Sequence, residues 1–338
     1  AQYIKNPLTQ VARAAKRLPA GVRFALTGTP IENRLSELWS IFDFLMPGLL
    51  GTRESFAKRF ESPVEHAEGD SAARLQALVS PFVLRRVKED VVADLPEKIE
   101  DTVMAQLTGE QRKLYLANQD RIAQQVQHRE AGEFKKDKLK VLAELTKLRQ
   151  ICCDPRLHYE DYKAGSAKLD TCMELVHGAL DGGHRILLFS QFTGMLDIIG
   201  KRLAKEDIAF LKLTGASSKE SRAKMVAQFQ AGEVPVFLIS LKAGGVGLNL
   251  TAADVVIHYD PWWNVAAQDQ ATDRAHRIGQ QHTVTVYKLI AKDTIEERIM
   301  QMQESKRDLV NSVLGGDGIS SALFTREDVL ALLGGDGR

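Results

Sequence analysis

The second half of the chain alternates short apolar runs, rich in β-branched residues, with stretches of helical spacing. Runs of this length and composition are typical of buried strands. Strands that alternate with helices indicate a parallel sheet covered by helices on both faces. We therefore predict an α/β fold with a doubly wound parallel sheet. Its expected strands are residues 185–190, 208–213, 236–240, 255–259 and 283–290.

Ligands of such sheets bind beyond the carboxyl ends of the strands. Polar or glycine-rich segments follow the expected strands at Ser190 and Gln191, at residues 213–215 and 240–247, and at Asp260. We expect these segments to meet at one edge of the sheet and to line a cleft. The glycines within 240–247 would let backbone amides approach a phosphate, although such a run taken alone is more often a plain turn.

A pair of arginines follows these segments. Arg274 and Arg277 lie three positions apart within residues 270–280, and on a helix this spacing puts both side chains on one face. A guanidinium is permanently charged and its planar fork matches a phosphoryl group, so one of the two could be an arginine finger. The alternative is an exposed helix in which Asp273 forms local salt bridges with the arginines.

Residues 236–264 and 270–280 together resemble motifs V and VI of the SWI/SNF-type ATPases, within helicase superfamily two. The resemblance extends over nearly the whole chain. Residues 26–45 resemble motif III and the helix after it, residues 186–192 resemble motif IV, and residues 81–98 and 148–157 resemble two further hallmarks of the family. It implies a RecA-like lobe, preceded by a partial first lobe with a mainly helical insertion.

Residues 1–7 resemble the tail of motif II with its Asp-Glu pair missing, and the phosphate-binding pattern G-x-x-x-x-G-K-[ST] does not occur in the chain. The resemblance thus implies that ATP and Mg²⁺ are bound mainly by an upstream ATPase lobe of the same parent chain. We expect no metal ligands in this chain, and no ATP hydrolysis by it alone.

The resemblance also assigns roles to single residues. Arg277 and Arg274 would be catalytic, while Thr27 and Thr29 would couple the nucleotide site to DNA. The expected nucleotide-binding residues are Gly247, Asn249, Gln270 and Asp273. The expected DNA-binding residues are Gly215, Ser240, Lys242 and Gly245, which would contact phosphates without reading bases.

Structural alternatives stay open for several of these positions. Ser240 could cap the end of a strand. For Trp262 and Trp263, burial of at least one ring in the core competes with base stacking. A structural hydrogen bond of His276 competes with proton transfer.

The chain has 45 Lys and Arg residues against 44 Asp and Glu, so its net charge does not favour DNA binding. We therefore expect DNA to be bound by particular residues that line the cleft. Its three cysteines match no zinc spacing and are interpreted as reduced core thiols. No apolar run is long enough to span a bilayer, and the start does not resemble a signal peptide.

We predict four parts along the chain. Residues 1–106 are expected to be the remnant of the first lobe, with a strand at 22–26, and 107–160 a helical subdomain. Its polar middle, 124–140, is interpreted as a solvated helical hairpin or mobile tip, with a merely exposed charged face as the preferred alternative. Residues 161–292 are expected to form the second lobe, and 293–338 a brace helix at 294–314 followed by a tail.

The predicted function is that of the C-terminal half of an ATP-dependent translocase or remodeller acting on double-stranded DNA. A strand-separating RNA helicase lobe is a rival interpretation, and a non-catalytic module that binds DNA or a protein partner is another. The short polar insertion favours a prokaryotic origin, hence a cytoplasmic, nucleoid-associated location, with a nuclear location if the source is eukaryotic.

Overall fold

The structure is a computed structural model that describes residues 1–28, 31, 35–62, 70–84, 86, 95–127, 131–241, 248–263, 265–301 and 326–334. The chain forms two compact units. The described residues up to 86 make most of the first unit, and nearly all those from 95 onward make the second.

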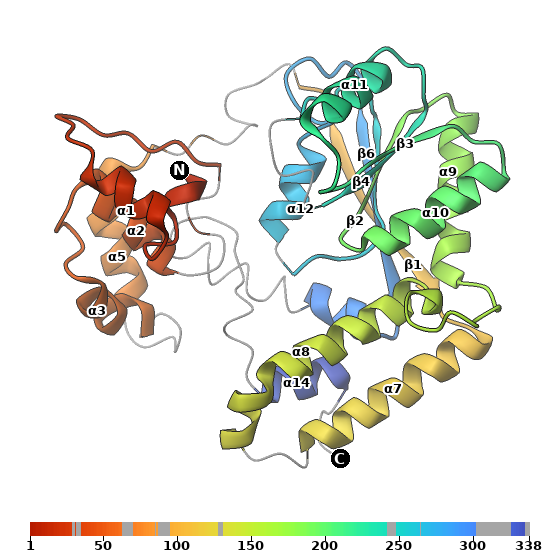
Figure 1. The fold of residues 1–338 in the computed structure, drawn as a ribbon, viewed down its shortest axis with the longest axis horizontal. Coiled ribbons are helices and arrows are strands. Elements are labelled where there is room, and N and C mark those ends of the chain that lie inside the picture. The colour runs from red at the N-terminus through yellow and green to blue at the C-terminus, as the bar shows by residue number, and fades with distance from the viewer. Residues whose placement is uncertain are drawn as a thin grey trace. The chain divides into compact units, whose positions relative to one another are not determined.

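A six-stranded sheet forms the centre of the second unit (Figure 1). Every neighbouring pair of strands is parallel, and the order is β1-β6-β5-β2-β4-β3. The strands are β1 (Lys98–Gln106), β2 (Ile186–Ser190), β3 (Phe210–Leu213), β4 (Val236–Ser240), β5 (Val255–His258) and β6 (Val284–Lys292). The predicted parallel α/β fold is confirmed, and five of these strands fall where the apolar runs predicted them.

Helices cover both faces of the sheet, because successive side chains of the central strands point to opposite sides. Ile186 and Leu188 of β2 pack in one cluster with α9 (Ala167–Asp181) and α10 (Thr193–Lys205). Leu187 and Phe189 pack in the other, which includes Phe229 of α11 (Lys219–Gln230) and Ala271 of α12 (Val265–Thr272). Three inner strands, β5, β2 and β4, are buried along their whole length, as a doubly covered sheet requires.

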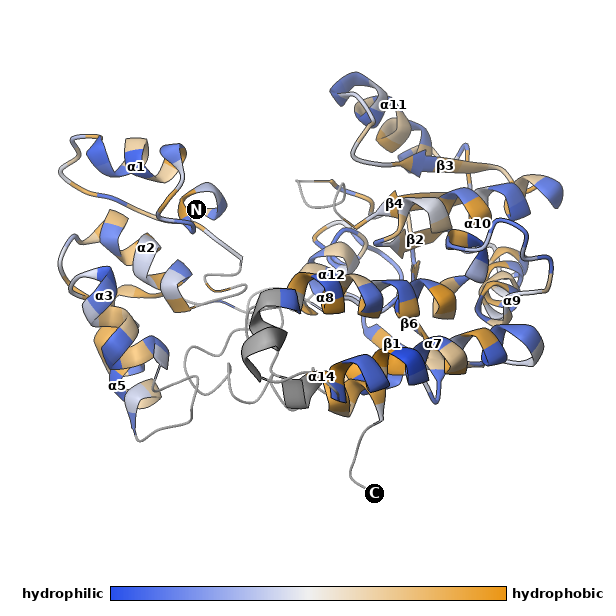
Figure 2. Cartoon of the chain, turned by 60° about the horizontal axis from the view of Figure 1, so that its bottom comes forward, coloured by the Kyte–Doolittle hydropathy of each residue, from blue (hydrophilic) through white to orange (hydrophobic). Residues whose placement is uncertain are grey.

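A helical hairpin lies next to this sheet and consists of α7 (Gly109–Gln127) and α8 (Ala131–Cys153). The predicted helical stretch is confirmed. In Figure 2, α7, α8 and α10 carry polar and apolar residues on different sides, as helices that bury one side do. The short helix α14 (Arg326–Leu333) packs on α7, where the Gln119 side chain donates to the carbonyl of Leu333 at 2.7 Å. A one-turn 3₁₀ helix, η4 (Pro155–Leu157), leads from α8 toward α9.

Residues 295–301 of the predicted brace helix are helical, and its bracing role stays a prediction. Its remaining part, 302–314, lies outside the described residues. The three cysteines are free and buried, and burial raises the pKa of each thiol. Among the described residues, no helix has the length and apolar character needed to cross a membrane.

The strand β1 was not predicted. It pairs in parallel with β6 from Lys98 opposite Val284 to Gln106 opposite Lys292. Most of its residues are exposed, because β1 lies at the edge of the sheet. Burial alone would raise the pKa of Glu100, but hydrogen bonds from Lys288 and Lys98 lower it to about 2. Edge pairing and ion pairs, rather than an apolar run, stabilise this strand.

The first unit is a helical cluster built around an aromatic core. Its elements are η1 (Gln2–Ile4), α1 (Gln10–Arg17), α2 (Leu35–Leu45), α3 (Arg53–Phe56), η2 (Ala57–Glu61), α5 (Ser71–Val79) and η3 (Ser80–Phe82). Phe42, Phe56 and Phe60 pack together in its core with Trp39. The indole of Trp39 donates to the carbonyl of Gly51 at 3.0 Å.

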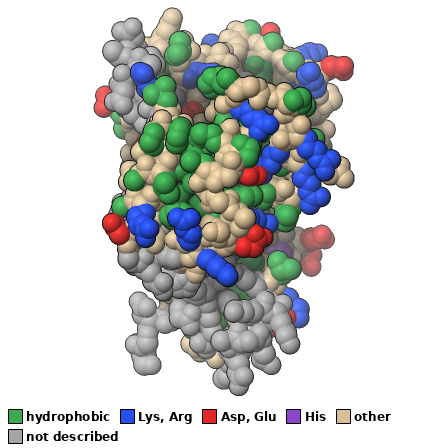
Figure 3. Space-filling model, turned by 90° about the vertical axis from the view of Figure 1, so that its left-hand side faces the viewer, with side chains coloured by type: hydrophobic (Ala, Val, Ile, Leu, Met, Phe, Trp, Pro, Cys, Tyr) green, Lys and Arg blue, Asp and Glu red, His purple; other side chains and the backbone are tan. Residues whose placement is uncertain are grey.

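The predicted strand at 22–26 is wrong for this structure. These residues form no regular secondary structure, because no strand of the described chain pairs with them. Val22, Phe24 and Leu26 are nevertheless 72, 81 and 83% exposed, at every second position. The segment therefore presents an apolar face. Figure 3 shows hydrophobic side chains gathered into a patch on the face that it draws.

Candidate functional site

The carboxyl ends of the parallel strands bring together the polar residues that the sequence predicted for one edge, here called the carboxyl edge. Ser190 and Ser240 are the last residues of β2 and β4 and lie opposite each other in the register. The amide of Leu241 donates to the carbonyl of Ser190 at 3.1 Å. Gly215 follows β3, the neighbour of β4, and is exposed.

Ser240 is only 3% exposed, so its hydroxyl lies beneath the surface of this edge. Lys242, Gly245 and Gly247 lie outside the described residues. Of the four predicted DNA-binding residues, the structure thus places Gly215 at the surface and Ser240 just below it.

A buried polar network joins the ends of β2 and β5 at this edge. The Asp260 carboxylate, which is fully buried, accepts hydrogen bonds from the Ser190 hydroxyl and, at 2.6 Å, from the Gln191 side-chain amide. The Gln191 amide oxygen in turn accepts from Arg149 at 3.1 Å. Arg149, on α8, is 1% exposed and also donates to the carbonyl of Pro261.

The two candidate catalytic arginines lie in turns rather than on a helix. The helix α12 ends at Thr272, and residues 273–279 form bends and turns. The prediction that a helix aligns Arg274 and Arg277 on one face is therefore wrong. The turn is completed at Gly279, whose φ of 102° lies in the left-handed region that favours glycine.

Gln280 holds this turn against the segment that follows the glycine-rich loop. Its side-chain nitrogen donates to the carbonyls of Ala253 at 2.7 Å, Ala275 at 3.1 Å and Thr251 at 3.2 Å. Its side-chain oxygen accepts from the amides of Gln281 and His282. No sequence pattern predicts this role of Gln280, because only the folded chain brings these carbonyls together.

Arg274 and Arg277 flank the predicted nucleotide-binding residue Asn249. The carbonyl of Arg274 accepts from the amide of Leu250 at 2.9 Å, and Nη1 of Arg277 lies 3.5 Å from the carbonyl of Leu248. Asn249, between these two neighbours, is exposed. The structure thus brings Asn249, Arg274 and Arg277 together.

The two guanidiniums differ in their surroundings. Arg277 is exposed, whereas Arg274 is half-buried and its Nε is a buried donor with no hydrogen-bond acceptor among the described residues. Burial and the nearby charge of Arg277 lower the pKa of Arg274, against the opposing effect of Asp273. A guanidinium whose buried Nε lacks an acceptor, beside a second cation, forms a local environment that suits an anion.

Gln270 and Asp273 are half-buried at the end of α12 and just after it. His276 makes the structural hydrogen bond that one of its two interpretations predicted, with Nε2 at 2.8 Å from the carbonyl of Pro96. The Trp262 ring is partly buried against the core, as the structural interpretation expected for at least one tryptophan. Thr27 is half-buried in the first unit, and Thr29 lies outside the described residues.

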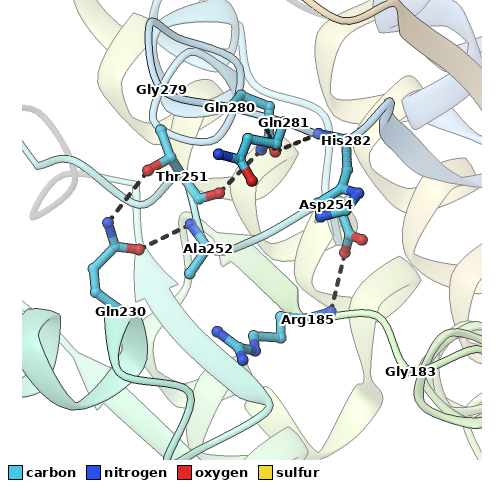
Figure 4. A pocket seen from close by; sticks show the side chains of 10 residues that line it. All are labelled: Gly183, Arg185, Gln230, Thr251, Ala252, Asp254, Gly279, Gln280, Gln281 and His282. Carbon is cyan, nitrogen blue, oxygen red and sulfur yellow. Dashed lines mark hydrogen bonds between the residues drawn. The ribbon is translucent and has the colours of Figure 1, made fainter.

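No group of three or more His, Cys, Asp or Glu side chains suited to a metal ion occurs in the described part of the chain. A polar cavity of about 430 Å³ opens at the opposite, amino ends of the strands (Figure 4). Arg185, Asp254 and His282, which precede β2, β5 and β6, line it. Gly279 and Gln280 of the arginine turn line the cavity as well, so it is separate from the carboxyl edge but not from this turn.

Two family models match this chain. The SNF2-related domain matches residues 1–157, and the helicase conserved C-terminal domain matches residues 167–279. A putative ATP-dependent helicase/translocase, YwqA of Bacillus subtilis, is 41% identical over 97% of the chain and 36% of its own length. An uncharacterized ATP-dependent helicase of Mycoplasma pneumoniae is 40% identical over 98% of the chain and 32% of its own length. The chain thus spans about a third of the length of these two relatives.

Solved structures give the same result. The SWI2/SNF2 ATPase core of Sulfolobus solfataricus in complex with dsDNA is 39% identical, with a TM-score of 0.57, and the match covers 93% of this chain and 67% of that one. The C-terminal domain of the Sulfolobus solfataricus SWI2/SNF2 ATPase is 32% identical with a TM-score of 0.57, and the match covers 70% of this chain and 98% of that domain.

Proposed function

Because the chain belongs to the SNF2 family of helicase-like ATPases, we propose that it forms the C-terminal half of an ATP-dependent translocase or remodeller of double-stranded DNA. One observation carries this proposal: Arg274 and Arg277 are held beside Asn249 in a turn that Gln280 fixes to the segment after β4. The paired guanidiniums support this proposal because their permanent charge and planar fork match phosphoryl oxygens.

Arg277 is the proposed arginine finger. Its side chain is exposed, and its hydrogen bond to the carbonyl of Leu248 is a long one, so it can extend toward a phosphate on a partner lobe. Phosphoryl transfer depends mainly on positioning and charge neutralisation, and an arginine finger contributes roughly 10³ to 10⁵ in rate. That factor corresponds to about 4 to 7 kcal/mol of barrier. Arg274, half-buried, would hold the turn and supply a second cation.

ATP and Mg²⁺ would be held mainly by an upstream lobe. The two guanidiniums and the unmatched Nε of Arg274 fit the phosphates of ATP. Mg²⁺, when bound to ATP, would neutralise charge on the phosphates. On this side of the nucleotide we propose Gly247, Asn249, Gln270 and Asp273 as binding residues.

The carboxyl edge would contact the DNA backbone through Gly215, Ser240, Lys242 and Gly245. The Sulfolobus relative with dsDNA supports a duplex as the ligand. Hydroxyl, amide and ammonium donors hold phosphates without reading bases, so we expect no sequence preference.

The exposed apolar face of residues 22–26 supports the upstream lobe as a partner. An extended segment with every second side chain apolar is suited to add to a sheet, and Val22, Phe24 and Leu26 would then become buried. Thr27 and Thr29, which follow this segment directly, are the proposed link between the nucleotide site and DNA.

Mutation of Arg277 tests the proposal. In the parent enzyme, Arg277→Ala should remove most of the DNA-stimulated ATP turnover while ATP binding stays nearly intact. The reason is that the negative charge of the transition state loses the guanidinium that stabilises it. Arg274→Ala should also lower turnover. Steady-state ATPase assays with and without duplex DNA, together with equilibrium nucleotide binding, measure both effects.

The matched control is Arg202→Ala, which removes a half-buried guanidinium of α10 that bonds to Glu206. It should leave turnover unchanged. Wild-type turnover in Arg277→Ala would refute the arginine-finger assignment, and stimulation by duplex RNA but not DNA would favour the RNA helicase interpretation.

A further inference from the structure

Arg149 is a charged residue for which the proposed chemistry has no use, yet it is almost completely buried beside the carboxyl edge. It belongs to α8 of the helical hairpin and is 1% exposed. A buried guanidinium is costly unless its donors find acceptors, so its partners indicate why it is there.

The partners of Arg149 belong to two different strand-end loops. Nη1 donates to the Gln191 side chain, in the loop after β2, and Nη2 donates to the carbonyl of Pro261, in the loop after β5. The planar fork of arginine can serve both acceptors at once, which a lysine ammonium cannot do with the same geometry. Arg149 therefore fixes the spacing between the two loops.

Gln191 extends this clamp to the buried carboxylate of Asp260. Its amide oxygen accepts from Arg149, and its amide nitrogen donates to Asp260. The same carboxylate accepts from the hydroxyl of Ser190, which lies opposite Ser240 in the sheet. An unbroken chain of hydrogen bonds thus runs from the hairpin to the strand ends.

A second contact reinforces the junction between α8 and the end of β5. The carbonyl of Cys153, the last residue of α8, accepts from the Tyr259 hydroxyl at 3.0 Å. Tyr259 directly precedes Asp260 and is fully buried. The end of the hairpin is therefore bonded on both sides of Asp260.

We infer that Arg149 is a positioning residue for DNA engagement, which clamps the loops after β2 and β5 and so fixes the buried strand ends, at Ser190 and Ser240, that support the carboxyl edge. The inference rests on the proposed function of the carboxyl edge. Arg149 itself contacts neither DNA nor nucleotide in this account.

The test measures the ATP turnover of the parent enzyme as a function of duplex DNA concentration. Arg149→Met should raise the DNA concentration for half-maximal stimulation by roughly tenfold or more, because hydrogen bonds to a charged group are lost. The rate at saturating DNA and the KM for ATP should change little. Arg149→Lys should give an intermediate DNA concentration for half-maximal stimulation, because the ammonium can donate a hydrogen bond to one of the two loops but not to both.

Gln191→Leu removes the middle of the same clamp and should raise the DNA concentration similarly. The double variant Arg149→Met with Gln191→Leu should be no worse than the stronger single variant, because both act on one connection. Arg121→Met is the matched control. It removes an arginine of the same hairpin that pairs with Glu144 instead of a strand-end loop.

A melting temperature that falls while the DNA dependence stays unchanged would show a merely structural role and overturn the inference. Additive effects in the double variant would overturn it as well. If Arg149→Met does not fold, Gln191→Leu and Arg149→Lys still decide. A wild-type parent whose turnover ignores duplex DNA would instead overturn the proposed function, and the inference with it.

Discussion

His258 occupies the last position of β5, stacked on Phe189 at a centroid distance of 5.5 Å. Its Nε2 lies 2.8 Å from the hydroxyl of Thr272, at the end of α12. Burial, and next the charge of Lys288, lower the pKa of His258 to about 3. The imidazole is therefore neutral in the folded protein at physiological pH.

This residue predicts a pH dependence of stability. An unfolded histidine binds a proton below pH 6.5, whereas His258 in the fold does so only near pH 3. Protonation of the unfolded state therefore leaves the free energy of unfolding unchanged above pH 6.5. As the pH falls from 6.5 toward 3, it lowers the free energy of unfolding by up to about 1.4 kcal/mol per pH unit. Urea unfolding of the wild type and His258→Gln across this range should show a smaller loss in the variant. His282→Gln, at an exposed site, is the control and should match the wild type; equal slopes in all three proteins would contradict the prediction.

Single residues also show how far the sequence could predict the site. The arginine pair and Asn249 could be named because they belong to local motifs. Arg149 could not be given its role from sequence, since its acceptors lie 42 and 112 positions away. Gln280 likewise bonds to carbonyls 27 and 29 positions back, which carry no side-chain signal.

Whole elements were predictable where a strand is buried on both faces and its sequence is therefore a continuous apolar run. The strands β2 and β4 are of this kind. The edge strand β1 has a polar sequence, and its pairing with a strand nearly two hundred positions later in the chain gives no local signal. Residues 22–26 have the opposite character, a strand-like pattern without a partner strand among the described residues. The predicted domain division stays a prediction, and β1 places residues 98–106 in the sheet of the second unit.

A buried ion pair attaches the helix after β6 to the second unit. Lys168 of α9 and Glu296 are both fully buried, and Glu296 also accepts from the amide of Ala291 at 2.9 Å. Glu296→Leu should lower the free energy of unfolding by about 3 to 5 kcal/mol, because it leaves a buried ammonium without its carboxylate. The double variant Lys168→Met with Glu296→Leu should recover most of that loss.

Equilibrium unfolding in urea measures these differences. Lys212→Met breaks an exposed ion pair with Asp197 and should cost less than about 1 kcal/mol. A double variant as unstable as Glu296→Leu would show that packing, rather than the unpaired charge, sets the cost.

At the scale of the whole molecule, a net charge of +1 limits how the chain can hold DNA. With only about two or three phosphates neutralised, the binding constant should fall with salt at a log–log slope of roughly −2 to −3 on B-form DNA. Lys242→Ala should flatten the slope by about one unit and weaken all duplexes alike. Titrations of random and fixed-sequence duplexes across a salt series test this. Tight binding to one sequence, or a slope near about −8, would indicate a sequence-specific or strongly basic binding module.

The central claim is that this chain supplies one half of an ATPase site, with Arg277 completing a pocket formed by an upstream lobe. The most direct measurement compares ATP turnover by residues 1–338 alone with turnover by the parent enzyme, each with Mg²⁺ and duplex DNA. We predict background turnover for the chain alone and DNA-stimulated turnover for the parent. DNA-stimulated hydrolysis by the purified chain alone that disappears in Arg277→Ala would contradict the half-site account.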